Sequence, residues 1–492
     1  MKKTLFILFG CLLCVVINSH AQNGITGNLQ WEITDGTLTI SGKGKMPDYR
    51  GGGFSPWSRY LKSISSVVIK KGVKSIGNNA FYIYPNTSIT SVTIPKSVTS
   101  IGEMSFRFCS NLSSVTIPNS VISIGNYAFG DCKSLTSVTI PNSVINIGDY
   151  AFDNCSGLKS VTIPNSVTSI GYCAFIKCKS LTSITIPNSV ISIGDNAFSE
   201  CNMLYEIKID ENHTTYSSMN GVLFNKDKTT IVAYPCGKTD TTYVIPASVT
   251  TIGNGAFSGC SGLTSITLPD SVTMIGYGAF SGCSGLTSIT IPNPVTAFSD
   301  YAFQSCSSLS SVIIPRSLTI IGHGAFNFCD LLSAIYVDAD NKKYASVDGI
   351  LFDKDTVSLI MYPCGKTNNS YNIPKSVNTI KEYSFSRCLN LNSIIVPDFV
   401  TTIEYHAFEF CDSLKSFTIP HSVTTIGDHI FLGCNDLTEI INQSTIPQTI
   451  KDDSFFRRYE MCTLRVPAAS VDTYRTADGW KNFKNIEAIK EN

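Results

Sequence analysis

Apolar and polar positions recur with one fixed spacing along most of the chain. A representative unit has apolar residues at Leu135, Val138, Ile140, Val144, Ile147, Ala151, Phe152 and Cys155. The alternation in Val138-Thr139-Ile140 predicts a short strand with valine and isoleucine directed inward and threonine outward. Pro141 ends this strand, because proline has no N–H to donate to a continuing ladder.

The second half of the unit predicts further short elements. Asn142-Ser143 suits a turn, and Ile147-Gly148 suits a second short extended piece. The stretch DYAFDNC, residues 149–155, predicts about one helical or 3₁₀ turn that begins at Asp149 and directs Phe152 inward. One unit is therefore a coil that brings the chain back to the start of the next unit.

The prolines that end the predicted strands give the period of the repeat. They recur with a constant period of 23 within three blocks, from Pro95 to Pro187, from Pro246 to Pro315 and from Pro374 to Pro420. Between blocks the step is 59, so an insert adds 36 to the period at each of these places. The two inserts are copies of each other, since Tyr216 and Tyr344 begin similar stretches, so the whole module is duplicated at an offset of 128.

A coil of this length cannot bury its own apolar side chains, so each coil must stack on the next, with strands about 4.8 Å apart. The Ile-Gly column from Ile76 to Ile426 predicts about 13 coils. We therefore expect a strand-dominated solenoid of mixed α/β type, with one long parallel sheet on one face. The inserts predict β-hairpins that turn at residues 225–228 and 353–356.

The two ends of the chain differ from the repeat and predict caps. A strict alternation around Asp35-Gly36 predicts a hairpin near the front, and the stretch with Trp480 and Phe483 predicts an amphipathic helix at the back. The expected organisation comprises a signal peptide at 1–21, an N-terminal β cap at 22–66, a solenoid at 67–441 with inserts at about 210–245 and 338–373, and an irregular coil with a helical cap at 442–492.

The repeated unit LxxVxIPxSVxxIGxxAFxxC resembles the bacterial leucine-rich repeat of the Treponema pallidum type, found in BspA-like surface antigens. The resemblance extends over nearly the whole chain after residue 21, including the Trp31 region, the inserts and the segment around Trp480. It implies a leucine-rich-repeat solenoid in a secreted or surface protein. It also implies adhesion to host matrix components such as fibronectin and fibrinogen, or to other cells.

Residues 1–21 predict export. Two lysines precede an apolar run from Leu5 to Ile17, and Ser19-His20-Ala21 forms a small-x-small cleavage site, so we expect cleavage after Ala21. Acylation at Cys11 is the alternative. The run is too short for a spanning helix, and we expect no transmembrane segment. The expected location is the cell surface or the medium, with the periplasm as an alternative.

Charge excludes some classes of partner. Lys and Arg total 37, Asp and Glu total 37, and only 15% of residues are charged. No basic stripe is available to capture nucleic acid or an anionic membrane, so we expect neither as a partner. The abundant serines and threonines instead predict a surface that contacts water through hydroxyl groups.

Cysteine is the first candidate for chemistry. Twelve cysteines share one column of the repeat: Cys109, Cys132, Cys155, Cys178, Cys201, Cys260, Cys283, Cys306, Cys329, Cys388, Cys411 and Cys434. Side chains stacked in a ladder point in parallel, which disfavours the torsion that a disulfide requires. We therefore predict a small buried filler at this column. Cys173, Cys236, Cys364 and Cys462 lie outside the column and receive no partner from the sequence.

The sequence offers little for catalysis. His406 and His429 are one period apart and so lie on adjacent coils, where two ligands are too few for a metal site and exposed loop residues are expected. Motifs such as G-x-S-x-G, H-E-x-x-H or a phosphate loop do not occur. We expect no enzyme, no cofactor and no metal, while a pair of sugar-cleaving carboxylates stays open.

The outward face of the predicted sheet is the candidate binding surface. Its threonine column includes Thr116, Thr139, Thr162, Thr185, Thr267 and Thr290. Short hydroxyls cost little side-chain entropy to order and both donate and accept hydrogen bonds, although threonine is also an ordinary solvent-facing strand residue. Glu206, Lys208 and Tyr336 interrupt this background, and binding energy concentrates in such exceptions.

Three functions follow from these observations. The first is an exported, non-catalytic adhesin that recognises a protein or glycan on a host or neighbouring cell through the solenoid face. The second is a structural envelope or matrix protein that acts by self-association. The third is an enzyme whose site the sequence does not reveal.

Overall fold

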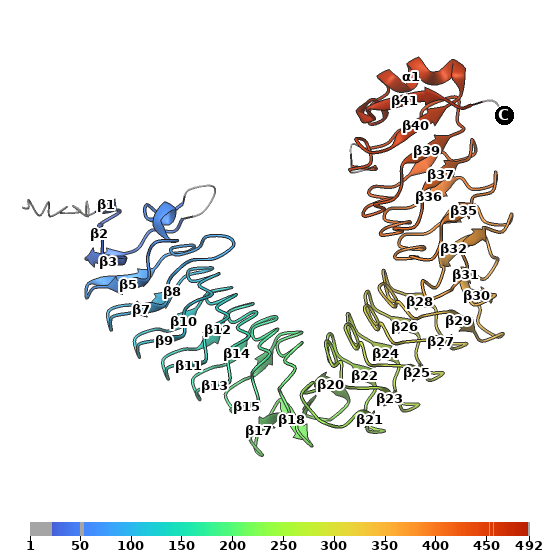
Figure 1. Cartoon of the computed structure of the whole chain (residues 1–492). Coiled ribbons are helices and arrows are strands. Elements are labelled where there is room, and N and C mark those ends of the chain that lie inside the picture. The colour runs from blue at the N-terminus through green and yellow to red at the C-terminus, as the bar shows by residue number, and fades with distance from the viewer. Residues whose placement is uncertain (1–21, 50–53, 452, 456, 491–492) are drawn as a thin grey trace, which may run out of the picture.

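The computed structural model describes residues 22–49, 54–451, 453–455 and 457–490. The predicted signal peptide and Cys11 lie outside these residues. Successive coils stack into an open arc that begins at β1 and ends near α1 (Figure 1). The fold is a strand-dominated parallel solenoid, which confirms the predicted class.

Most coils contribute a strand of three or four residues towards the outer side of the arc and a strand of two residues towards its inner side (Figure 1). The outer strands are β5 (Ser66–Ile69), β7 (Ser91–Thr93), β9 (Ser114–Thr116), β11 (Ser137–Thr139), β13 (Ser160–Thr162), β15 (Ser183–Ile186), β17 (Glu206–Ile209), β21 (Thr242–Val244), β23 (Ser265–Thr267), β25 (Ser288–Thr290), β27 (Ser311–Ile314), β29 (Ala334–Val337), β33 (Ser370–Asn372), β35 (Ser393–Ile395), β37 (Ser416–Ile419) and β39 (Glu439–Asn442).

The inner strands are β4 (Gly44–Lys45), β6 (Val73–Ile76), β8 (Ser100–Ile101), β10 (Ser123–Ile124), β12 (Asn146–Ile147), β14 (Ser169–Ile170), β16 (Ser192–Ile193), β22 (Thr251–Ile252), β24 (Met274–Ile275), β26 (Ala297–Phe298), β28 (Ile320–Ile321), β34 (Thr379–Ile380), β36 (Thr402–Ile403) and β38 (Thr425–Ile426). The first insert adds β18 (Tyr216–Met219), β19 (Val222–Asn225) and β20 (Thr230–Ala233). The second adds β30 (Tyr344–Val347), β31 (Ile350–Asp353) and β32 (Ser358–Met361).

The remaining elements lie at the two ends. The front has β1 (Gln22–Thr26), β2 (Leu29–Thr34), β3 (Thr37–Gly42) and the 3₁₀ helix η1 (Ser58–Tyr60). The back has β40 (Thr463–Val466), η2 (Ala468–Ser470), α1 (Val471–Thr476), η3 (Trp480–Asn482) and β41 (Asn485–Ala488). The helix expected around Trp480 is not continuous, because α1 ends at Thr476 and Gly479 adopts a positive φ of 75° before η3.

Stacking follows the predicted register. Val138 pairs with Val161 and Thr139 with Thr162 in the parallel pair β11–β13, and Ile147 pairs with Ile170 in β12–β14. The prediction of one long sheet was wrong. Within the described residues the inner strands, together with the insert strands β18 to β20 and β30 to β32, form three sheets of seven, seven and six strands, and the outer strands form shorter sheets. Both ladders are interrupted at the inserts.

The inserts also explain why 13 coils was too low a number. Strand β20 pairs in parallel with β22, and β32 pairs in parallel with β34, so each insert supplies a further turn of the solenoid. Strands β4 at the front and β40 at the back extend the stack as well. The structure has about 18 turns. The predicted hairpins are present as β19–β20 and β31–β32, and each is preceded by a strand that the sequence did not indicate.

The predicted helical or 3₁₀ turn at 149–155 was wrong. Tyr150 and Asn154 both adopt positive φ values, 56° and 53°. The N–H groups of Tyr150, Phe152 and Asn154 each donate to a carbonyl of the following coil at 2.8 Å. Because these donors point along the stack, they are not available for the bonds that would hold a helix.

Stacked phenylalanines form the centre of the core. Phe152 is fully buried, and its ring lies parallel to those of Phe129 and Phe175, with centroids 5.5 Å and 5.3 Å away. The buried side chains group into three core clusters. They extend from Leu29 to Ala233, from Val222 to Met361 and from Ile350 to Ile486. The boundaries between clusters fall within the two inserts.

The cysteine column is buried as predicted and has a further role. The Cys155 thiol donates to the Phe129 carbonyl of the preceding coil at 3.1 Å, and the same contact recurs along the column. Burial raises the pKa of Cys201 to about 12, so such a thiol stays protonated and keeps its donor. Cys260 corrects the filler prediction, because it forms a disulfide with Cys236 of the first insert.

An acidic group inside the stack gives a pH-dependent prediction. Burial, and to a smaller extent the neighbouring Asp131, raise the pKa of Asp153 from 3.8 to about 6. The folded state therefore binds more protons than the unfolded state between these values, and stability falls as pH rises through them.

We expect Asp153→Asn to be more stable than the wild type at about pH 7, with the difference vanishing at about pH 4. Urea unfolding of both proteins at the two pH values measures this. An equal difference in stability between the two proteins at both pH values would contradict the raised pKa of Asp153.

Candidate binding surfaces

The predicted threonine column exists as an exposed row on the outer strands. Thr116, Thr139 and Thr162 are in register on β9, β11 and β13, with the intervening valines directed inward. All three are exposed, and within the described residues they make no side-chain hydrogen bond. Their hydroxyl groups are therefore available to a ligand.

Many other hydroxyl groups already donate hydrogen bonds to a neighbouring coil. Ser143 donates to the Val121 carbonyl of the preceding coil at 2.5 Å, and Thr168 donates to the Ile145 carbonyl at 3.3 Å. These contacts hold coils together, so the hydroxyl content of the sequence overstates the surface that is free to bind.

The exposed row of the first module, which runs from Thr116 to Thr185, ends at Lys208 and Glu206. Lys208 is in register with Thr185 on the pair β15–β17, and its ammonium lies 3.3 Å from the Glu206 carboxylate on the same face. The Lys208 side chain is 55% exposed. The first insert closes this edge, because the Ile207 N–H donates to the Gly221 carbonyl at 2.9 Å.

Tyr336 takes the place in the second module that Lys208 takes in the first. It is 54% exposed and in register with the exposed Ile313 on β27–β29. Thr267 and Thr290 precede it on β23 and β25, next to the exposed Val244. The exposed row of the second module, from Val244 to Tyr336, is therefore more apolar at both ends than the row of the first module.

The structure does not unite all the predicted residues. Thr116, Thr139 and Thr162 share one sheet, and Thr185 shares another with Lys208 and Glu206. Thr267 and Thr290 lie beyond the first insert, and Tyr336 lies at the second. A ligand must extend along the arc to contact both rows.

A pocket that sequence reasoning missed lies where the second insert joins the solenoid. It has a volume of about 380 Å³, and its walls come from the turn after β28, from β30 to β32, and from the coils that contain β34 and β36. Tyr344 spans the break in the inner ladder, since its hydroxyl accepts from the Ile321 N–H at 3.1 Å and donates to the Thr319 carbonyl at 3.2 Å.

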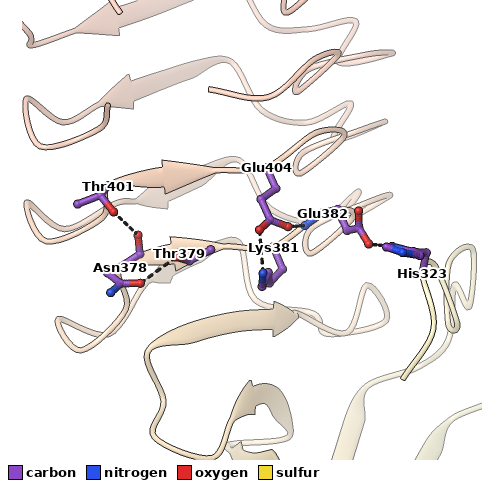
Figure 2. A network of polar contacts seen from close by, with 7 residues as sticks. All are labelled: His323, Asn378, Thr379, Lys381, Glu382, Thr401 and Glu404. Carbon is purple, nitrogen blue, oxygen red and sulfur yellow. Dashed lines mark hydrogen bonds and ion pairs between the residues drawn. The ribbon is translucent and has the colours of Figure 1, made fainter. Parts of the chain in front are cut away.

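Charged side chains form the rim of this pocket, and Figure 2 shows the contacts among them. The Lys381 ammonium donates to one Glu404 oxygen at 2.8 Å, and the Glu382 N–H donates to the other at 3.2 Å. His323 faces the Glu382 carboxylate from the opposite side of the insert (Figure 2). Burial raises the pKa of Tyr383, also on the rim, to about 12, so its hydroxyl stays a donor at neutral pH.

His406 and His429 lie on adjacent coils as predicted, but both are half-buried rather than exposed. Their rings are stacked, with centroids 5.3 Å apart, and the His406 Nδ1 lies 3.4 Å from the Glu409 carboxylate. The Tyr383 ring stacks on the His406 ring, with centroids 5.2 Å apart. This histidine pair thus continues an aromatic column that begins at the pocket.

One further observation concerns membranes. Among the residues that the structure describes, no helix has the length and apolar character needed to cross a bilayer.

Comparison with known proteins gives a family match. The family described as BspA type leucine-rich repeat region, with six copies, matches residues 59–140, 122–235, 229–346 and 361–477. A search of curated proteins finds no significant match.

Three solved structures are similar to this chain, and the first of them has the same kind of fold. The pneumococcal vaccine antigen PcpA is 18% identical, with a TM-score of 0.52, over 96% of this chain and 99% of that chain. A leucine-rich repeat protein from Eubacterium ventriosum is 26% identical, with a TM-score of 0.47, over 83% of this chain and 94% of that chain. A leucine-rich repeat protein of T. pallidum is 23% identical, with a TM-score of 0.23, over 63% of this chain and 91% of that chain.

Proposed function

The chain belongs to the family of proteins with BspA-type leucine-rich repeats, and from that premise we propose that it is an exported, non-catalytic binding protein that adheres to a protein or glycan on a host or neighbouring cell. Proteins of this repeat family are generally non-catalytic binding proteins of the bacterial surface. Export rests on residues 1–21, which have the pattern of a cleaved signal peptide.

The observation that carries the proposal is the exposed row on the outer strands. Parallel register repeats one side-chain position about every 4.8 Å, so the row presents equivalent groups along the arc. A long ligand gains one weak contact per coil, and the sum gives affinity without a deep pocket. Lys208 and Tyr336 are the expected anchors, because charged and aromatic side chains contribute most to binding energy at an interface.

Binding to immobilised fibronectin, fibrinogen and polysaccharides tests this function. We expect saturable binding of the chain without residues 1–21, and a loss of at least about tenfold in affinity when Lys208 and Tyr336 are both replaced with alanine. The measurement is surface plasmon resonance, with circular dichroism to show that the variant is folded.

The matched control replaces an exposed lysine and an exposed tyrosine elsewhere, Lys133 and Tyr84, with alanine. This control is expected to bind like the wild type. Equal losses in both double variants would contradict the proposed anchors. Concentration-dependent assembly in sedimentation velocity, with no foreign ligand bound, would instead favour self-association.

A further inference from the structure

The pocket at the second insert is much larger than the equivalent pocket at the first insert. The same junction occurs at the first insert, in the earlier copy of the module, where residues from Asn196 to Ser258 enclose a volume of only about 10 Å³. Both junctions have the same backbone plan. Tyr216 accepts from the Ile193 N–H at the first junction as Tyr344 accepts from the Ile321 N–H at the second. The difference therefore comes from side chains.

The two junctions differ at the position of Asn196. At the first junction the Asn196 side chain fills the gap, since its Oδ1 occupies the place where a Cβ of Gly255 would stand. At the second junction the residue equivalent to Asn196 is Gly324, which has no side chain. A Cβ added at Gly324 would stand 2.8 Å from the Asn327 amide nitrogen and from the Tyr301 ring, so these two side chains lie next to it, and Tyr383 replaces Gly255 at the edge of the pocket.

The rim has changed as well. Lys381, Glu382 and Glu404 stand where the first module has Gly253, Asn254 and Gly276. At the first junction the Asn254 side-chain amide donates to the Asp195 carboxylate across the insert at 2.8 Å. The second junction has instead gained an ammonium, two carboxylates and a phenol around an opening.

The lining limits the class of ligand. The floor is apolar, with Phe326, Leu351 and Met361 among its residues. Two carboxylates on the rim disfavour an anion. Each carboxylate already has a partner, Lys381 for Glu404 and His323 for Glu382, so a cation would have to displace it. A neutral ligand with many hydroxyl groups fits this mixture best, because each hydroxyl donates to a carboxylate and accepts from an ammonium or a phenol.

We propose that this pocket binds one or two pyranose units of a glycan. The C–H face of a sugar ring would lie against the apolar floor, and its hydroxyls would bond to Lys381, Glu404 and Tyr383. The volume of about 380 Å³ lies at the lower end of the range for small-molecule sites. This site is separate from the outer strands, so it goes beyond the proposed function and does not depend on it.

Titration calorimetry of the chain without residues 1–21 tests the proposal, with cellobiose, maltose, lactose and N,N'-diacetylchitobiose as probes. We expect at least one disaccharide to bind with a Kd between about 10 μM and 1 mM. The triple variant Lys381→Gly, Glu382→Asn, Glu404→Gly installs the rim of the first junction and is expected to weaken that binding at least about tenfold.

Controls separate this site from the outer face. The variant with alanine at Lys208 and Tyr336 is expected to keep full disaccharide affinity, even where it loses polymer binding. If the triple variant does not fold, as judged by circular dichroism, Glu404→Gln provides the same test with a smaller change. Absence of binding by all four sugars at about 10 mM would overturn the proposal, as would unchanged affinity in folded rim variants. Saturable binding of n-butylammonium in place of the sugars would overturn the ligand class.

Discussion

Replacing Gly171 with alanine is expected to destabilise the protein by about 3 kcal/mol. A Cβ at this position would stand 2.6 Å from the backbone nitrogen and from the side-chain oxygen of Asp149 in the preceding coil. That coil cannot retreat, because Asp149 accepts from the Tyr172 N–H at 2.8 Å and Gly171 donates to the Ile147 carbonyl at 2.9 Å. Urea unfolding followed by circular dichroism measures the loss.

Gly262 provides the control for this substitution. It is exposed, has no heavy atom within 4 Å of an added Cβ, and lies in a turn of the same repeat. Gly262→Ala is expected to change stability by no more than about 0.5 kcal/mol. Equal unfolding midpoints for the two alanine variants would show that close coil packing at the Ile-Gly column does not limit stability.

Phe152→Ala is expected to cost about 3 to 5 kcal/mol. The ring is fully buried between two parallel rings, so its removal leaves a cavity that the neighbouring coils cannot close without breaking their own backbone bonds. Stability in a solenoid is a sum over coils and interfaces. Hydrogen exchange is therefore expected to rise first in the coils around residue 152, before the rest of the chain.

Phe399 is the matched control, because it is a phenylalanine of the same repeat that is 61% exposed. Phe399→Ala is expected to leave the unfolding curve within about 0.5 kcal/mol of the wild type. Should Phe152→Ala behave in the same way, the ring column would not be the core of the molecule.

The strict period made the stacking predictable. A constant spacing with inward valines and isoleucines allows only one register, and Val138 pairs with Val161 as that register requires. The local conformation between strands was not predictable in the same way. Propensity favoured a helical turn at 149–155, but hydrogen bonds to the next coil imposed positive φ values at Tyr150 and Asn154. Contacts between coils override local preference there.

The pocket was out of reach of pattern analysis for a different reason. His323 and Glu382 are far apart in the sequence and meet only because an insert lies between their coils. A signal was nevertheless present, since alignment of the two modules reveals that the glycines at 253, 255 and 276 are replaced by Lys381, Tyr383 and Glu404. Differences between duplicated modules would have been a better guide than the uniform threonine column.

Cys260 shows a second limit of pattern analysis. Its column predicts a filler, and the column alone gives no reason to treat it differently from Cys283. Its partner, Cys236, comes from the insert, whose path the repeat does not determine. The predicted roles of Lys208, Tyr336 and the threonine row stay predictions until binding is measured.

The division of the interior at the two inserts has a mechanical consequence. In the inner ladder between β16 and β20 the Tyr216 hydroxyl stands in for the regular pairing of neighbouring strands, and the Tyr344 hydroxyl does the same between β28 and β32. A molecule held at one end and pulled at the other would yield first at these joints. It would then lengthen in steps of one section at a time, and the sections still folded would keep their surfaces intact under load.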